Sequence, residues 1–75
     1  MNKARREAIS KVIDKVDEAR WDLDVIRDEE QEAYDNMPEG LQSSERGETM
    51  ADGLETLDSI IDSLEEISDQ LGEFL

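Results

Sequence analysis

The apolar residues of the first half of the chain recur in alternating steps of three and four. This spacing keeps successive apolar side chains on one side of an α-helix and matches the a and d positions of a heptad repeat. It predicts a helix over about residues 3–35, which Glu30 interrupts at one a position. With Ile9 at a, the apolar a and d positions are Ile9, Val12, Val16, Ala19, Leu23, Ile26, Ala33 and Met37.

The second half of the chain carries a wider apolar stripe and predicts a helix over about residues 45–74. With Met50 at a, the a and d positions are Met50, Gly53, Leu57, Ile60, Leu64, Ile67, Leu71 and Phe74. The e positions add Leu54, Ile61 and Leu75. An apolar stripe of three positions in seven is wider than one partner helix covers.

A loop over residues 36–44 separates the two predicted helices within a single domain, residues 1–75. The only Pro of the chain is Pro38, and proline disfavours helical geometry at the preceding residue. The first helix should therefore end near Asp35 or Asn36. Either Ser43 or Ser44 can cap the start of the second helix with its hydroxyl group.

Two helices of matched length joined by a short loop predict an all-α fold, an antiparallel two-helix hairpin resembling a coiled coil. If the two a and d seams face each other, they define one register. The expected pairs are Ile9 with Leu71, Val12 with Ile67, Val16 with Leu64, Ala19 with Ile60, and Leu23 with Leu57.

A single hairpin of this size has little core, because chains of this length rarely gain more than about 3 to 5 kcal/mol from one core. Self-association would cover the e positions of the second helix. We therefore expect a homodimeric four-helix bundle, or a larger even oligomer. Its predicted interface residues are Leu54, Ile61 and Leu75.

The composition narrows the functional classes. The chain has 22 acidic and 8 basic residues, a net charge of −14, and neither Cys nor His. Without Cys, a disulfide scaffold and a zinc finger are excluded. Without His, most zinc and iron sites and catalytic triads lack their commonest ligand or base. We expect no enzyme activity, no metal and no cofactor. No apolar run is long enough for a membrane span, and the N-terminus lacks a signal-peptide core, so a cytoplasmic location is expected.

The charges are unevenly distributed along the chain. Six of the eight basic residues lie within residues 1–20. In the predicted hairpin they would pair with acidic residues near the end of the second helix, and such pairs favour orientation more than stability. Nucleic-acid binding is disfavoured, because the net negative field repels phosphate. An acidic rod could instead resemble nucleic acid to a basic cleft on another protein.

Trp21 and Val25 are the first candidate site. They lie one helical turn apart, outside the predicted a and d seam. One interpretation is an ordinary surface pair or a contact within a bundle. The other is a binding site for a second protein, since Trp is enriched at the energetic centres of interfaces.

The loop and its flanks contain two further candidate sites. An acidic cluster lies in the last turns of the first predicted helix. We interpret it as a solvated surface and not as a metal or catalytic site, because a hairpin offers no sheltered pocket. Its members are Asp28, Glu29, Glu30, Glu32 and Asp35. Polar loop residues could bind an anion or nucleotide at the start of the second helix, or could simply cap it. They are Asn36, Gln42, Ser43, Ser44, Arg46 and Gly47.

The stretch from Arg27 to Glu48 resembles one found in small uncharacterised acidic helical proteins of bacteriophages and prophages. The shared pattern reads DEEQEA-aromatic-DN-x-PE-x-LQ, followed by SE-basic-GE. The resemblance implies a phage or prophage origin, carries over no catalytic residue, and favours a small inhibitor of host defence or host enzymes. The sequence therefore predicts a self-associating interaction protein of a bacterial host cell. The alternative is an oligomer that sequesters a small molecule, such as a nucleotide, in the 36–47 loop.

Overall fold

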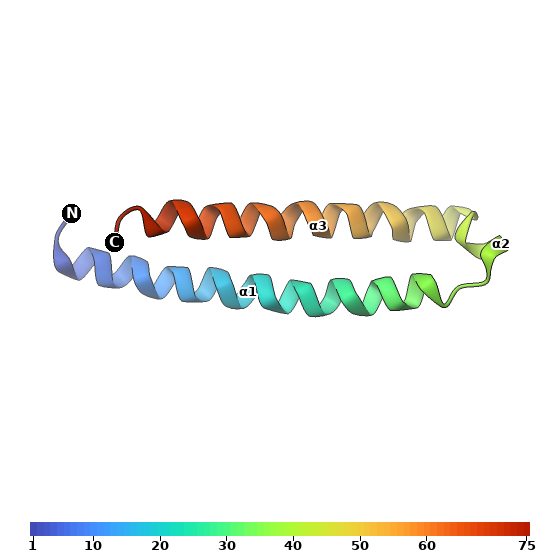
Figure 1. The fold of residues 1–75 in the computed structure, drawn as a ribbon, viewed down its shortest axis with the longest axis horizontal. Helices are drawn as coiled ribbons and strands as arrows, with labels where there is room; N and C mark the ends of the chain where they lie inside the picture. The colour runs from blue at the N-terminus through green and yellow to red at the C-terminus, as the bar shows by residue number, and fades with distance from the viewer.

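A computed structural model describes all residues 1–75, and all of its regular secondary structure is helical. The long helices are α1, Lys3–Asp35, and α3, Glu45–Gly72, and the short helix α2, Glu39–Gln42, lies at the corner between them. Figure 1 shows α1 and α3 side by side in opposite directions, with α2 at one end. The fold is an antiparallel helical hairpin, a rod of 58 × 15 × 12 Å between Cα atoms. No helix in it has a segment long and apolar enough to cross a bilayer.

Side-chain caps explain where both long helices begin. Asn2 precedes α1 in an extended conformation, and its Oδ1 accepts a hydrogen bond from the backbone N–H of Arg5 at 2.9 Å. Ser44 precedes α3 in the same way, and its Oγ accepts from the N–H of Gly47 at 3.3 Å. These bonds satisfy donors that have no partner within the first turn of a helix. Of the two serines expected as caps, Ser44 is the one used.

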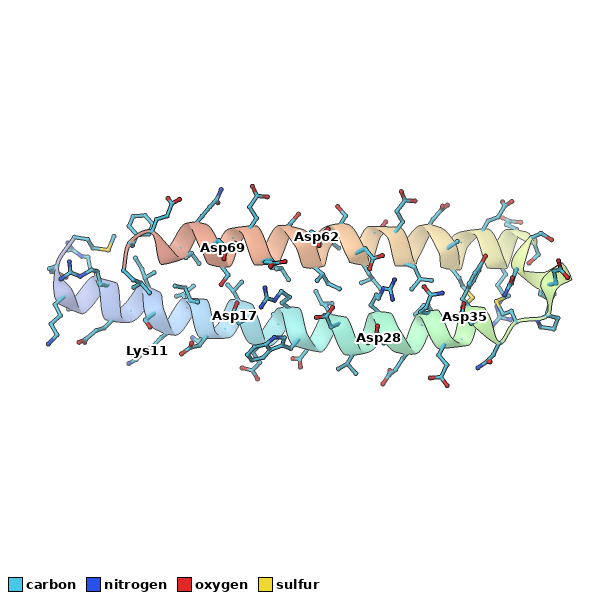
Figure 2. All side chains as sticks on the ribbon, viewed as in Figure 1. Lys11, Asp17, Asp28, Asp35, Asp62 and Asp69 are labelled. Carbon is cyan, nitrogen blue, oxygen red and sulfur yellow. The ribbon has the colours of Figure 1, made fainter.

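The two long helices contact each other through their a and e positions, not through a and d as the sequence pattern predicted. Between α1 and α3, the side chains shielded from water are mainly those at a and e. On α1 they are Ile9, Ile13, Val16, Arg20, Leu23, Arg27, Glu30, Tyr34 and Met37. On α3 they are Gly47, Met50, Leu54, Leu57, Ile61, Leu64, Ser68 and Leu71. Figure 2 shows side chains of both helices filling the space between the ribbons.

The predicted register is wrong by about one helical turn. Asp17 accepts a hydrogen bond from the Ser68 hydroxyl at 2.8 Å, although the prediction placed Val16 opposite Leu64. Arg27 pairs with Asp58, whereas the predicted pairing of Leu23 with Leu57 would place Arg27 opposite Gly53. Counting along both helices from these contacts brings Leu23 near Ile61. The shift follows from the change of seam, because e positions of one helix now lie against a positions of the other.

Two of the three residues expected to need a second chain for burial, Leu54 and Ile61, are already covered within the hairpin. Leu54 is 6% exposed and is the one buried apolar side chain, and Ile61 is half-buried. Leu75, at the C-terminus, is exposed. The premise that Leu54 and Ile61 are exposed in a single hairpin is therefore wrong. The exposed apolar side chains of α1 and α3 lie mostly at d positions.

Candidate functional site

Trp21 and Val25 lie on the side of α1 that faces away from α3. Their side chains are 60% and 57% exposed. Residues four apart on a helix are neighbours, so the indole ring and the Val25 methyl groups form one small apolar patch. Asp22, Asp24 and Asp28 lie beside this patch in the sequence, so the patch is bordered by carboxylates.

The acidic residues of α3 are confined to part of its surface. All of them occupy b, c or f positions, and all are exposed. From Gly47 onward, the a, d, e and g positions of α3 carry no charge. The acidic residues, including Glu73 just after the helix, are Glu45, Glu48, Asp52, Glu55, Asp58, Asp62, Glu65, Glu66, Asp69 and Glu73.

One flank of the hairpin carries the polar contacts between the helices. Arg27 donates to Asp58 from Nε at 2.7 Å and from Nη2 at 3.3 Å, a two-pronged pair. The hydrogen bond and the charge of Asp58, with a smaller contribution from Asp28, raise the pKa of Arg27 above its ordinary value. Farther along the same flank Ser68 donates to Asp17, which also lies 3.8 Å from Arg20. These contacts orient α3 on α1.

The basic N-terminal residues do not pair with the end of α3, contrary to the sequence-based expectation. The ion pair between the two helices is Arg27 with Asp58, whereas Lys3 pairs with Glu7 on its own helix at 3.9 Å. Figure 1 gives the reason, since α1 extends past the C-terminus of the chain. The start of α1, with Lys3, Arg5 and Arg6, is therefore an overhang that α3 does not cover.

The polar loop residues make hydrogen bonds within the corner itself. Gln42 donates from Nε2 to the carbonyl of Tyr34 at 2.9 Å, which ties α2 to the end of α1. Ser43 donates to the Gly40 carbonyl at 3.3 Å, and Ser44 donates to the carbonyl of Leu41. The Asn36 backbone N–H bonds the Glu32 carbonyl and ends α1. Arg46 is exposed and forms no ion pair.

Gly47 is buried at this corner for a steric reason. A Cβ atom there would overlap the carbonyl oxygens of Gln42 and Leu41. Glycine thus lets the last turn of α2 lie directly against the first turn of α3. This packing function accounts for Gly47 without a ligand, and it was not evident from the sequence, which placed Gly47 only among the possible ligand residues.

The structure contains no pocket, and no three acidic side chains gather closely enough to hold a metal ion. The acidic cluster of α1 is divided, since Glu30 lies half-buried at an a position while Glu29 and Glu32 are exposed. The candidate sites are therefore surfaces. One of these surfaces, the exposed d positions, was not predicted from the sequence, because the apolar pattern assigns those residues to the hairpin seam.

The hairpin and its surfaces define an acidic two-helix rod. No family model, characterised protein or solved structure matches this chain.

Proposed function

We propose that the chain is a non-enzymatic acidic interaction protein that self-associates and binds a second, different protein through its outer surface. The observation that carries this proposal is the exposure of Trp21 and Val25 on the outer side of α1. Large apolar side chains cost free energy in water, about 25 cal/mol for each Å² of apolar surface. A partner that covers the indole ring recovers that free energy.

The charge of the outer surface indicates the kind of partner. With a net charge of −14, the rod attracts a protein with a basic face and repels acidic ones. The resemblance to phage and prophage proteins suggests a host or phage protein in the cytoplasm of a bacterial host. One form of this function is inhibition of a host defence protein whose basic cleft normally holds nucleic acid.

Affinity capture from a bacterial host lysate tests the proposal. The immobilised wild-type chain should retain a discrete protein, and Trp21→Glu should lose it. Leu41→Ala is a matched control, because Leu41 is a similarly exposed apolar residue, at 52%, on α2. It should retain the same protein as the wild type. The proposal fails if no protein is retained, or if Trp21→Glu and the wild type retain the same set.

The captured protein then allows a direct measurement with the single Trp of the chain. Titration with this partner should reduce quenching of Trp21 fluorescence by acrylamide, because the partner excludes the quencher from the indole. If the cleft is one for nucleic acid, a short DNA duplex should displace the chain, and binding should weaken as salt screens the charges. Displacement by DNA without any change in Trp21 quenching would contradict a contact through Trp21.

A further inference from the structure

The d positions of α1 and of α3 lie on the same face of the hairpin. Each residue turns a helix by about 100°. Around the helix axis, the d positions therefore lie on one side of the a positions, and the e and b positions lie on the other side. The contacts Arg27–Asp58 and Asp17–Ser68 each join an e position to a b position. The two b and e flanks therefore share one face, and the two d rows share the opposite face.

This opposite face, the apolar face, is uncovered. Four of its side chains are Val12, Ile26, Ile60 and Ile67, which are 45%, 51%, 43% and 43% exposed. Phe74 at one end is 50% exposed, and Ala19 lies between Val12 and Ile26. The apolar face is thus defined by Val12, Ala19 and Ile26 from α1, by Ile60 and Ile67 from α3, and by Phe74 just after α3.

The border of the apolar face on α3 carries no charge. Its g positions are Thr49, Thr56, Ser63 and Gln70. The hydroxyl groups of Thr49, Thr56 and Ser63 donate to carbonyls one turn earlier in their own helix, at 2.9, 3.0 and 2.9 Å. These three hydroxyl donors already have partners, so covering this border would leave none of them without a hydrogen bond. The free-energy cost of burying these polar side chains is therefore lower.

The hairpin leaves exposed the more apolar of the two rows that α1 offers. The e row that faces α3 holds two arginines and two apolar or aromatic residues, Ile13, Arg20, Arg27 and Tyr34. The exposed d row holds only apolar residues, Val12, Ala19, Ile26 and Ala33. The d row can be buried without taking a charged group out of water, whereas the e row cannot. This arrangement indicates that a further surface covers the apolar face.

The exposed area of the whole rod exceeds that of a compact chain by about one side of a protein interface. The chain exposes 5628 Å². A compact monomer of 8.6 kDa exposes about 4,700 Å², so the surplus is about 900 Å². The broad side of the rod, 58 by 15 Å, has an area of about 870 Å², and a standard interface buries about 800 Å² on each partner.

We propose that the apolar face is covered by the apolar face of a second copy of this chain, with the two hairpins antiparallel and their corners at opposite ends. This proposal deepens the self-association included in the proposed function and names its surface. It replaces the interface of Leu54, Ile61 and Leu75 expected from the sequence. A two-fold axis near Ala19 brings Val12 of each copy beside Ile26 of the other.

The charges favour this orientation. In the antiparallel arrangement the basic overhang of each copy, with Lys3, Arg5 and Arg6, lies beside the acidic last turns of α1 in the other copy. Lys15, at a g position beside the apolar face, comes level with Asp22 of the other copy. With the corners at the same end, the two basic overhangs would instead lie together and repel each other.

Sedimentation equilibrium at micromolar concentration tests the surface. The wild type should have twice the mass of the 8.6 kDa chain, and Ile67→Glu should halve that mass. Val25→Glu places the same charge on the outer side of α1 and should remain a dimer. A monomeric wild type would overturn the proposal, and so would a dimer that Val25→Glu dissociates but Ile67→Glu does not.

Cross-linking tests the orientation without an acidic substitution on the apolar face. The chain has no Cys, so Ala19→Cys introduces a single thiol near the expected two-fold axis. A short bismaleimide should link two copies of this variant, and should not link copies of Asp28→Cys, whose side chain is 77% exposed. A dimer that Ala19→Cys does not cross-link would overturn the antiparallel arrangement. The proposed function is tested separately from the dimer, because Val25→Glu should lose the heterologous partner and remain a dimer. If Val25→Glu keeps both the partner and the dimer, the proposed function fails and the dimer proposal stands.

Discussion

Gly47 is the residue at which one added methyl group should matter most. It lies where α2 and α3 meet, and a Cβ atom would overlap two carbonyl oxygens of the backbone. Backbone atoms cannot rotate away as a flexible side chain does, so the corner itself must shift. Gly47→Ala should therefore lower the free energy of unfolding by about 1 to 3 kcal/mol, the usual cost of overpacking, in urea titrations followed by circular dichroism.

Gly53→Ala is the matched control for this prediction. Gly53 lies inside α3 with nothing within 4 Å of the position a Cβ atom would take. Alanine restricts the unfolded chain and favours the helix by about 0.5 to 1 kcal/mol relative to glycine. The same substitution should thus stabilise at Gly53 and destabilise at Gly47. Equal effects at both sites would show that the corner does not pack as tightly as described.

Leu54 is the most deeply buried apolar residue of the hairpin, and its truncation should be costly. Replacement of a buried leucine by alanine typically costs about 2 to 5 kcal/mol. Leu54→Ala should lie in this range, and Leu57→Ala should cost less, because Leu57 is only half-buried. Urea titrations at one fixed protein concentration give both values. The reverse order would place the hairpin contact back at the a and d positions.

At the scale of the helices, sequence periodicity predicted the elements but not the face that joins them. Pro38 and Ser44 mark the helix ends through local geometry, which a sequence records directly. The seam depends on competition between the d and e rows, and both rows lie beside the same a positions. Hydrophobicity alone favoured d. In the hairpin the e row of α3 supplies the shielded Leu54 and Ile61. The same seam lets Arg27 reach Asp58 and Ser68 reach Asp17, and such pairs between distant residues are not visible in a periodic pattern.

The pair of Arg27 and Asp58 orients α3 on α1. If attraction between the two charges matters, the positive and negative residues should be interchangeable between the two positions. Arg27→Asp alone should lower the thermal midpoint, because two carboxylates then face each other. The double variant Arg27→Asp with Asp58→Arg should recover part of the loss by restoring attraction. Circular dichroism melts at low salt provide the comparison. No recovery in the double variant would mean that Arg27 stabilises the hairpin by packing of its side-chain carbons alone.

For the whole molecule, the net charge opposes the proposed association of two copies. Each chain carries a net charge of −14, so joining two copies brings like charges together. Raising the salt from about 0.01 to about 0.15 M shortens the screening length from about 30 to about 8 Å. The thermal midpoint should therefore rise with salt, and also with protein concentration by mass action. A midpoint independent of both would contradict a dimer held by the apolar face.

The tight corner around Gly47 also has a consequence for the order in which the hairpin forms. The entropy lost on closing a loop grows with the length of chain enclosed. Contacts next to the corner, such as Gln42 with Tyr34, enclose few residues, whereas Asp17 and Ser68 enclose most of the chain. Folding should therefore start at the corner, and contacts between α1 and α3 should then form in order toward the chain termini. Substitutions at the corner would then slow folding, and those near Ser68 would mainly speed unfolding.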